Sequence, residues 1–303
     1  MSHKPVMVQE TLTYLLHDNS QSILDATVGC GGHTMAILKA DPSVRVLGID
    51  RDAQALRDAQ RMLKAFATRI RLVETNFVDV GKVLSEWGRV DGILADLGVS
   101  SLQLDTSSRG FSYSKDGPLD MKMSPEGRTA RMLLQETQHS DLAQILRQYG
   151  EVSGATRIAR SIRRAVERNN MRTTRDLAIA IDSALPGVAT PALLSKVFQA
   201  VRIAVNDELR NITEFLERVF TYVNQNARIV IISYHSLEDR LIKDFFRRES
   251  KDCLCPTAVP VCTCDHSARL EVLTRRVVKP SVEEITRNTR ARSARLRAAR
   301  VLG

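Results

Sequence analysis

Aromatic residues are scarce in this chain of 303 residues, where they make up 5% of the sequence and include a single tryptophan. The core must therefore rest on aliphatic side chains, and a hydrophobic content of 43% supplies enough of them for one large domain or two ordinary ones. Long apolar runs are also missing: none approaches the ~20 residues that span a bilayer, and residues 1–5 carry no signal-peptide segment. We therefore expect a soluble, cytoplasmic protein with no membrane partner.

Acidic residues are outnumbered, 35 against 44 basic ones, which leaves a net charge of +9. Such an excess favours a polyanionic partner, with nucleic acid first and an anionic membrane surface second. Cysteine is rare, and in a cytoplasmic protein the five thiols are expected to be reduced or to bind metal.

Four of the cysteines form two C-x-C pairs with six residues between the pairs: Cys253, Cys255, Cys262 and Cys264. Four thiolates suggest tetrahedral zinc, but structural zinc sites usually have two to four residues within each pair. A zinc site and a reduced thiol loop both remain open, and we assign no metal site from the sequence.

The most informative segment is the glycine-rich turn at residues 29–32, which lies between an apolar run at 22–26 and a helical pattern at 34–39. Three glycines in four positions permit backbone angles and close approaches that a Cβ would block. A strand–turn–helix of this kind presents N–H groups to a ligand at the sheet edge. The next apolar run, 44–49, ends in Asp50, where a carboxylate can accept both hydroxyls of a ribose. The sequence therefore predicts a nucleoside-bearing cofactor.

Short apolar runs alternate with helical patterns through residues 21–100, which is typical of a parallel sheet with helices on both faces. A loop-rich stretch at 105–128 then leads into helices alone, before strand signals return near residue 228. The expected strands are 22–26, 45–49, 70–74, 92–95, 228–233, 270–279 and 293–301. The expected helices are 53–67, 129–135, 141–148, 155–169, 176–185, 191–223 with a break near Asn206 and Asp207, and 237–248.

These patterns predict an α/β fold in which a doubly wound domain is interrupted by an all-helical insertion. We expect the first part of the domain at residues 1–104, the insertion at 105–205 and the second part at 206–303. Two capping boxes are expected at helix starts, from Thr173 with Asp176 and from Ser236 with Asp239.

Three groups of candidate site residues follow the predicted strands. Asp96 ends the strand 92–95 and faces the cofactor crevice, where it can accept a hydrogen bond from a substrate amine or the cofactor. Its structural alternative is a capping acid. Phe77, just past the third strand, is expected to border an adenine ring, against the alternative of a core residue. Tyr234 and His235 open a helix, and His235 can orient a substrate or take up a proton. The structural alternative for this segment is a helix cap formed by Ser236 with Asp239.

An arginine stripe is predicted on the helix at 155–169. At 100° per residue its members lie within an arc of roughly 80°: Arg157, Arg160, Arg164 and Arg168. Guanidinium groups bind phosphate bidentately, so the stripe is interpreted as an RNA contact, against the alternative of a merely solvated face. The tail at 287–300, with six arginines and no acid, supports the same interpretation.

Several long motifs occur in a fixed order along nearly the whole chain, at residues 3–6, 25–33, 91–105, 109–112, 116–123, 198–203, 233–240 and 290–293. In these motifs the chain closely resembles the bacterial 16S rRNA cytosine-N4 methyltransferases of the RsmH/MraW family. One departure is Thr289, where relatives commonly carry proline. That position is far along the chain from the cofactor motifs.

The resemblance implies a Rossmann-like class I methyltransferase fold, S-adenosylmethionine as cofactor, and methylation of N4 of cytidine 1402 in the decoding region of 16S rRNA. The implied partner is the small ribosomal subunit or its RNA, and the helical insertion is implied to recognise the substrate. The implied cofactor contacts are Gly31, Gly32, His33, Asp50, Phe77, Asp96 and Gln103.

The catalytic hypothesis assigns Asp96 to accept a hydrogen of the cytosine amine, with Tyr234 or His235 positioning the base. One rival is a nicotinamide-dependent oxidoreductase, although His33 and Thr34 stand where the last glycine of G-x-G-x-x-G should fall. A second rival is a non-catalytic RNA-binding or assembly factor. The sequence leaves open monomer or homodimer, and naked RNA or assembled subunit as substrate.

Overall fold

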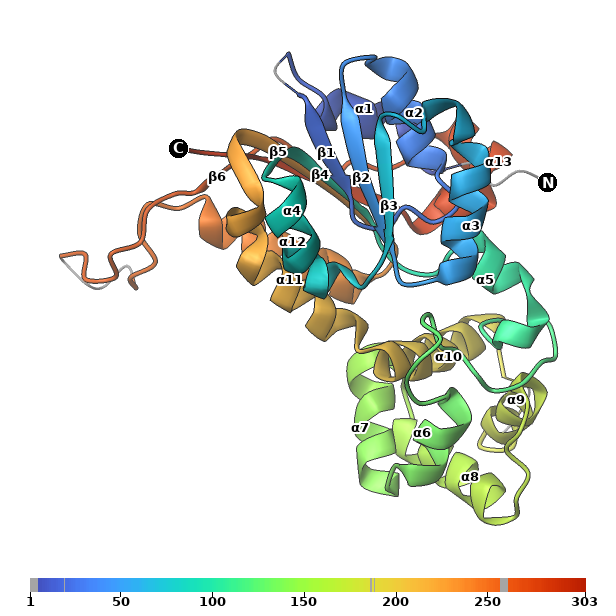
Figure 1. The fold of residues 1–303 in the computed structure, drawn as a ribbon. Coiled ribbons are helices and arrows are strands. Elements are labelled where there is room, and N and C mark those ends of the chain that lie inside the picture. The colour runs from blue at the N-terminus through green and yellow to red at the C-terminus, as the bar shows by residue number, and fades with distance from the viewer. Residues whose placement is uncertain (1–4, 19, 186, 188, 257–260) are drawn as a thin grey trace. The chain divides into compact units, whose positions relative to one another are not determined.

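The computed structural model describes residues 5–18, 20–185, 187, 189–256 and 261–303 (Figure 1). The chain forms two compact units. The first, which we call the sheet unit, combines Met1–Gly98 with Leu209–Gly303, and the second, the helical unit, is Val99–Glu208. The chain therefore leaves the sheet unit after Gly98, builds the helical unit, and returns. Among the described residues, no helix combines the length and the apolar character that crossing a membrane requires.

A seven-stranded sheet organises the sheet unit, in the order β3-β2-β1-β4-β5-β7-β6. β1 to β5 run parallel, whereas β7 is antiparallel to both β5 and β6. The strands are β1 (Ser22–Asp25), β2 (Arg45–Asp50), β3 (Ile70–Glu74), β4 (Val90–Asp96), β5 (Val223–Ser233), β6 (Leu270–Val272) and β7 (Arg295–Val301). The parallel part with a reversed strand near one edge is the Rossmann-like arrangement expected from the sequence.

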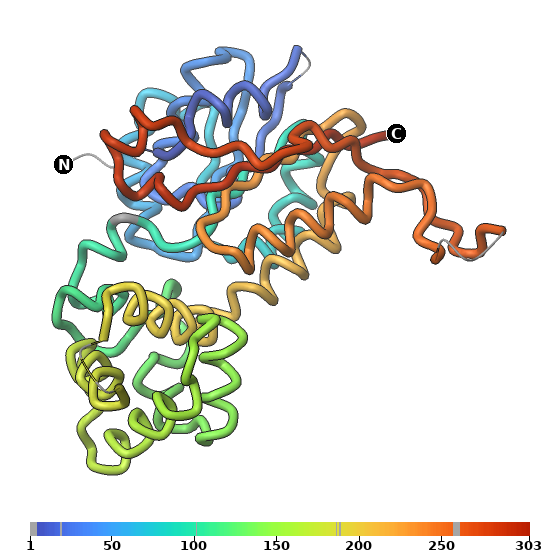
Figure 2. Tube along the Cα trace, turned by 180° about the vertical axis from the view of Figure 1, so that it is seen from behind, coloured from blue at the N-terminus to red at the C-terminus, as the bar shows by residue number. Residues whose placement is uncertain are grey.

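Helices cover both faces of this sheet because successive strand residues point to opposite sides. Ile23 packs into one apolar cluster and its neighbour Leu24 into the other. One cluster is covered by α4 (Val80–Trp87), α11 (Glu208–Tyr222) and α12 (Ser236–Glu249). The other is covered by α1 (Val8–Leu15), α2 (Gly32–Ala40) and α3 (Ala53–Met62). Figure 2 shows the red C-terminal segment, which carries α13 (Val282–Arg287) and β7, lying along the sheet unit on the side seen from behind.

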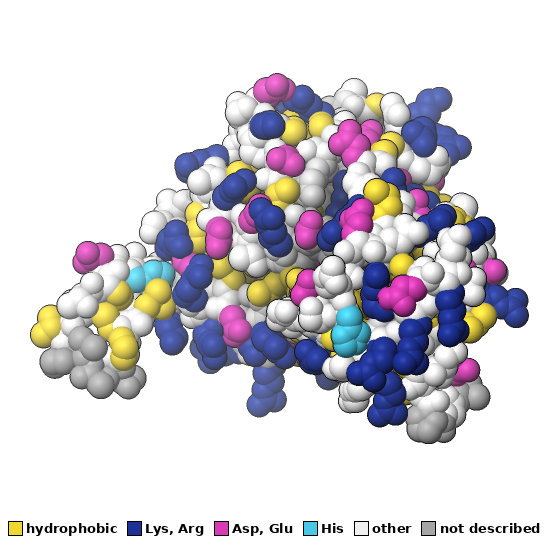
Figure 3. All heavy atoms as spheres, turned by 90° about the horizontal axis from the view of Figure 1, so that it is seen from below, with side chains coloured by type: hydrophobic (Ala, Val, Ile, Leu, Met, Phe, Trp, Pro, Cys, Tyr) yellow, Lys and Arg dark blue, Asp and Glu magenta, His cyan; other side chains and the backbone are white. Residues whose placement is uncertain are grey.

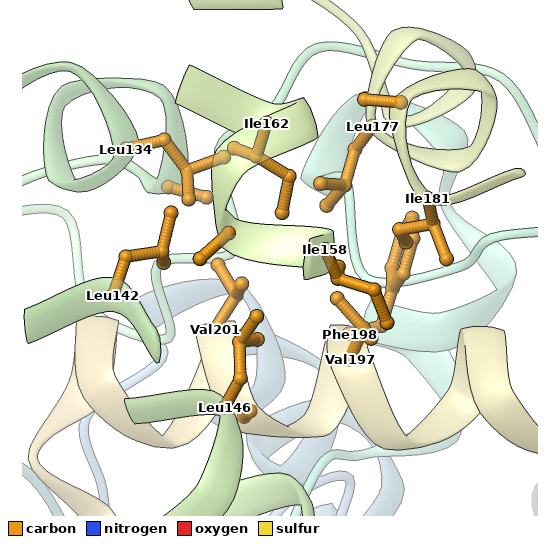
Figure 4. Close-up of a cluster of buried hydrophobic side chains, with 14 of the residues drawn as sticks. Leu134, Leu142, Leu146, Ile158, Ile162, Leu177, Ile181, Val197, Phe198 and Val201 are labelled. Carbon is orange, nitrogen blue, oxygen red and sulfur yellow. The ribbon is translucent and has the colours of Figure 1, made fainter. Parts of the chain in front are cut away.

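The helical unit packs around its own aliphatic core (Figure 4). Its helices are α5 (Ser101–Asp105), α6 (Ala130–Glu136), α7 (His139–Gly150), α8 (Ala155–Glu167), α9 (Thr174–Asp182) and α10 (Pro191–Asn206). The capping box of Thr173 with Asp176 is confirmed at the start of α9. The break expected near Asn206 is confirmed too, because Asp207 adopts a left-handed conformation with φ of 49°.

Three expected elements are wrong in detail. The strand expected at 270–279 ends at Val272, because the hydroxyl of Thr274 accepts the N–H of Ala298 at 2.9 Å and interrupts the ladder. The helix expected at 53–67 ends at Met62, and a short 3-10 turn follows. The capping box expected from Ser236 and Asp239 is formed one residue earlier, by His235 with Glu238.

Candidate functional site

The glycine-rich turn joins β1 to α2 and links the C-terminal end of β1 to that of β2. Gly29 has φ of 52°, and its N–H donates to Oδ2 of Asp50 at 2.9 Å. A Cβ on Gly29 would meet nothing nearer than 3.9 Å, so this part of the turn is open. A Cβ on Gly31 would lie 2.9 Å from a methyl of Leu63, and one on Gly32 would lie 3.1 Å from Pro5. Glycine at 31 and 32 is therefore favoured by the packing of the turn against Leu63 and Pro5.

The first turn of α2 provides hydrogen-bond donors to the same region. Its N-cap is Gly31, in the left-handed conformation with φ of 89°, and no side chain caps the helix. The first N–H groups of a helix have no partner within the helix. They favour polar or anionic groups of a ligand, and the helix dipole adds to this preference.

Asp50 ends β2 with its carboxylate held in one orientation. Oδ2 accepts the N–H of Gly29 and Oδ1 accepts the N–H of Asp52, both at 2.9 Å. A carboxylate oxygen has two lone pairs, so each oxygen keeps one for a further donor. Burial raises the pKa of Asp50, and the two N–H bonds only partly oppose this effect. The arrangement suits the two vicinal hydroxyls of a ribose.

Asp25, at the end of β1, is a buried carboxylate that ties the strand to α2. The hydroxyl of Thr34 donates to Oδ2 at 2.6 Å, and the N–H of Thr27 donates to Oδ1 at 3.2 Å. Burial raises the pKa of Asp25 to about 6, against the lowering effects of Thr34, His33 and Thr27. The folded chain therefore holds this proton more tightly than the unfolded chain does.

The raised pKa of Asp25 makes a prediction about stability. The folded state binds more protons than the unfolded state between the two pKa values, so Asp25 contributes stability at low pH that is lost as pH rises through about 6. When the pH is lowered from 7 to 5, the free energy of unfolding of the wild type should rise by about 1 kcal/mol relative to that of Asp25→Asn. Urea unfolding followed by Trp87 fluorescence measures this difference in the sheet unit. Parallel pH dependences of the two proteins would contradict it.

Asp96 ends β4 at the centre of a cluster that joins three of the predicted site residues. The hydroxyl of Tyr234 donates to Oδ1 at 2.8 Å, and Nε2 of His33 lies 3.6 Å from Oδ2. The backbone N–H of Asp96 donates to the hydroxyl of Thr27 at 2.7 Å. The ends of β1, β4 and β5 and the start of α2 thus meet at this carboxylate.

The carboxylate of Asp96 raises the pKa of both neighbouring groups, Tyr234 and His33. Burial raises the pKa of Tyr234 well above its usual value, and Asp96 raises it further, so the phenol remains a donor at neutral pH. Burial lowers the pKa of His33, but the nearby Asp96 and Asp25 outweigh burial and raise it overall.

His33 also provides a test of whether a polar ligand fits here. Its side chain is buried; in the described part of the chain its Nδ1 has no hydrogen-bond partner, and its Nε2 has only the 3.6 Å ion-pair contact with Asp96. A buried polar group without a partner costs about 1–3 kcal/mol. A polar ligand at this edge of the sheet, next to Asp96 and the open side of Gly29, can supply that partner. The residues present therefore fit a polar, nucleoside-bearing cofactor.

His235 caps α12, in place of the Ser236 expected from the sequence. Its Nδ1 accepts the N–H of Glu238 at 3.4 Å, and its Nε2 lies 3.2 Å from Oε1 of Glu238. The other oxygen of Glu238 accepts the N–H of Tyr234 at 2.9 Å. The ring is therefore fixed in orientation directly after β5, and its catalytic role stays a prediction.

A polar cavity of about 380 Å³ lies beside Tyr234 and His235. It is formed because β7 pairs with β5 in a register that sets Arg295 opposite Ser233. Sequence reasoning missed this cavity and Lys279, because no local pattern reveals the pairing of β5 with β7. The remaining lining residues are Ser236, Lys279, Arg292, Ser293, Ala294 and Arg295. Three cations make the cavity suited to phosphate.

The arginine tail divides between ion pairs and the lining of the cavity, and its contact with RNA stays a prediction. Arg297 pairs with Asp239 at 2.7 Å, and Arg300 pairs with Glu271 at 2.6 Å. Arg297 thereby ties β7 to α12, and Arg300 pairs with Glu271 directly opposite it on the neighbouring strand β6. Arg292 and Arg295 line the cavity, and Arg295 also pairs with Asp239 at 3.4 Å.

Phe77 and Gln103 complete the residues predicted to hold the cofactor. Phe77 follows β3 and packs edge-on against Phe215 of α11, with ring centroids 5.4 Å apart. Gln103 belongs to the helical unit, where it forms the capping box of α5 with Ser100. The cofactor contacts of both side chains stay predictions.

The arginine stripe lies on α8 of the helical unit, and Arg157, Arg160, Arg164 and Arg168 are all exposed. Arg163 on the same helix differs, because its guanidinium donates to the carbonyls of Leu134, Gln135 and Thr137 at the end of α6. Figure 3 shows Lys and Arg side chains gathered on the face seen from below.

The sheet order and the turn after β1 define a Rossmann-like class I methyltransferase fold. The chain belongs to the MraW methylase family, whose model matches residues 1–302. It is similar to proteins named ribosomal RNA small subunit methyltransferase H. The relative from Syntrophotalea carbinolica is 44% identical, over 99% of this chain and 98% of its own. Those from Halothermothrix orenii and Carboxydothermus hydrogenoformans are 42% and 44% identical, with the same coverage.

Proposed function

We propose that this chain transfers a methyl group from S-adenosylmethionine to N4 of cytidine 1402 in 16S rRNA of the small ribosomal subunit. The observation that carries the proposal is the cluster of His33, Asp96 and Tyr234 at the end of β4, in a chain of the MraW methylase family. We place the reaction in the cytoplasm, where ribosomal RNA is modified, and we assign no membrane partner.

The sheet unit offers the residues that would hold the cofactor. Asp50 accepts the ribose hydroxyls, and the glycine turn with the first N–H groups of α2 binds polar parts of the ligand. Phe77 borders the adenine of the cofactor, and a polar group of the cofactor gives His33 a hydrogen-bond partner. When bound, S-adenosylmethionine supplies a methyl group that its sulfonium has already activated. The main task of the protein is then to align the reacting atoms in a dry site.

Asp96 is the residue proposed to prepare the cytosine amine. The lone pair of N4 is delocalised into the ring, so the amine is a poor nucleophile. A carboxylate that accepts an N4 hydrogen draws the nitrogen toward tetrahedral geometry and localises the pair. Tyr234 already donates to Oδ1, so Oδ2 is the oxygen assigned to the amine. In this scheme Tyr234 is a positioning residue that orients the carboxylate of Asp96. His235 lines the cavity and is assigned to position the cytosine.

RNA recognition is proposed at two basic surfaces, one in each unit. Lys279, Arg292 and Arg295 line the cavity beside Tyr234, where they can bind phosphates that flank the target base. The exposed arginines of α8 provide a second phosphate-binding surface on the helical unit. The base must leave its stack to reach the site, and phosphate contacts at the cavity can hold the nucleotides that flank it.

The proposed function is tested by mapping N4-methylcytidine in 16S rRNA from cells with and without this chain. We expect the modification at position 1402 to disappear without the chain. A single-turnover assay with labelled methyl donor, on naked RNA and on assembled subunits, separates an enzyme from a non-catalytic assembly factor. Calorimetry with S-adenosylmethionine and with a nicotinamide cofactor separates a methyltransferase from an oxidoreductase. Unchanged methylation in cells that lack the chain would refute the proposal.

Tyr234→Phe tests the positioning role. The variant loses the hydrogen bond to Asp96, and a bond to a charged group contributes about 1.5–3 kcal/mol. If the phenol orients the carboxylate, kcat should fall by roughly 10- to 100-fold, while KM for the cofactor changes little. Tyr14→Phe is the matched control, because this tyrosine packs on the apolar cluster near α1 and should tolerate the loss of its hydroxyl. Equal kcat for both variants would exclude the role.

A further inference from the structure

The segment between α12 and β6 contains four of the five cysteines (Figure 1). We call residues 253–264 the thiol hairpin, of which 253–256 and 261–264 are described. Figures 1 and 2 show this orange segment extending away from the rest of the sheet unit, and Figure 3 shows yellow side chains, the class that includes cysteine, upon it. The proposed methyltransferase reaction makes no use of it.

The four sulfur atoms of the thiol hairpin are gathered at one point. Sγ of Cys253 lies 3.3 Å from that of Cys262 and 3.8 Å from that of Cys264, and the latter two are 3.5 Å apart. With Cys255 included, all four lie within 4.8 Å of one another. A tetrahedron with metal–sulfur bonds of about 2.3 Å has sulfur–sulfur edges of ~3.8 Å. The sulfurs are thus spaced as ligands of one ion, and none is at the ~2.05 Å of a disulfide.

Backbone N–H groups point at these sulfurs across the hairpin. The middle residue of each C-x-C pair donates to a sulfur of the other pair: Leu254 to Cys264 at 3.3 Å, and Thr263 to Cys255 at 3.4 Å. Donors of this kind stabilise thiolate charge and orient metal ligands. They also explain the short spacing of one residue within each pair, because the two pairs face each other and each supplies two ligands.

The described residues of the thiol hairpin, 253–256 and 261–264, form no hydrophobic core that could hold this arrangement by itself. Cys253 and Cys262 are exposed, and Leu254 and Val261 are 41% and 71% exposed. At the base of the segment, by contrast, the buried carboxylate of Glu249 accepts from Arg248 and Arg269. The base is closed by ion pairs, and small segments without a core are usually held by a metal or disulfides.

We propose that Cys253, Cys255, Cys262 and Cys264 bind one zinc ion. Four soft thiolate ligands at tetrahedral spacing select zinc or iron among the common metals, and zinc is the usual ion of closed, redox-inactive Cys₄ sites. Four protein ligands leave no position for water or substrate, so the ion is structural. It fixes the two C-x-C pairs to each other, as Glu249 fixes the base of the segment. Binding replaces the thiol protons by the metal and releases them to solvent.

Elemental analysis of the full chain, purified without an affinity tag that binds metal, tests the proposal. We expect one zinc per chain in the wild type and less than a tenth of that in Cys253→Ser/Cys262→Ser. Cys30→Ser is the matched control, because Cys30 lies in the glycine turn outside the hairpin, and it should keep one zinc. Zinc-free wild type, or zinc retained by the double variant, would overturn the assignment. Iron in place of zinc would overturn the identity of the metal.

A second measurement does not depend on whether the variants fold. Wild-type chain stripped with a chelator and reduced should bind one equivalent of Co²⁺ and develop the visible bands and near-ultraviolet charge-transfer absorption of a tetrahedral cobalt–thiolate site. Added Zn²⁺ should remove these bands. In thiol titration, four more cysteines should react in the stripped chain than in the zinc-loaded chain. An absorption spectrum of octahedral cobalt, or equal thiol counts in the two forms, would contradict the site.

Discussion

Asp96→Asn should lower the rate of methyl transfer at saturating cofactor by about 10²–10⁴-fold, the range found when a positioned proton acceptor or charge stabiliser is removed. The variant keeps the size of the side chain but removes the negative charge proposed to draw the amine hydrogen. It also replaces one acceptor oxygen by an NH₂ donor. The two ends of the amide therefore cannot both accept, one from the amine and the other from Tyr234, as the two carboxylate oxygens are proposed to do. The loss should appear in single-turnover rates with labelled methyl donor.

The matched comparison for this prediction is Asp50→Asn. Both acids end parallel strands of the same sheet, but Asp50 is assigned to the ribose and Asp96 to the amine. We expect Asp50→Asn to weaken cofactor binding, measured by calorimetry, more than it lowers the rate at saturation. For Asp96→Asn the loss of rate should exceed any loss of cofactor affinity. Full methyl transfer by Asp96→Asn would remove the aspartate from the mechanism.

Reversing two charges on α8 should have the largest effect on RNA binding. Arg160→Glu/Arg164→Glu replaces two exposed cations by anions within the arginine stripe. If both contact phosphate, RNA affinity at low salt should fall by roughly 10²-fold or more, and the slope of log K against log salt should become shallower by about 1.4–1.8. Cofactor affinity should not change, because the cofactor residues proposed on the sheet unit are untouched.

Lys39→Glu/Lys64→Glu is the control for total charge. These lysines are exposed on the sheet unit, and their reversal changes net charge by the same amount. The control should keep most of the RNA affinity and an unaltered salt slope. Filter binding or fluorescence anisotropy at several salt concentrations measures both quantities. Equal RNA affinity of the α8 variant and the wild type at every salt concentration would exclude the stripe as a binding surface.

Local patterns in the sequence were sufficient where a segment's own residues determine its structure. The apolar run at Ile70–Glu74 is β3 at the expected bounds, and Thr173 with Asp176 caps α9. The break after Asn206 is also local, since Asp207 tolerates a left-handed conformation. Among the candidate site residues, the adjacency of His33, Asp96 and Tyr234 follows from the rule that carboxyl ends of parallel strands meet.

Contacts between distant segments could not be read in the same way. The ion pair of Arg297 with Asp239 and the cavity lined by Lys279 depend on the register of β7 against β5, which is set by the whole sheet. The N-cap of α12 is one residue earlier than expected, because the ring of His235 can accept a backbone N–H as a serine hydroxyl does. The usual spacing rule for structural zinc sites counts only the residues within one cysteine pair. It therefore could not predict that the two C-x-C pairs of the thiol hairpin face each other.

The hydrogen bond between Tyr234 and Asp96 joins residues 138 positions apart, and the helical unit occupies most of the interval. During synthesis the ribosome therefore completes Asp96 and then the whole insertion before Tyr234 emerges. An incomplete chain cannot assemble the proposed methylating centre, however well its N-terminal strands have folded, because Tyr234 is still missing. We therefore expect nascent fragments of this protein to be inactive in RNA methylation until translation has passed β5.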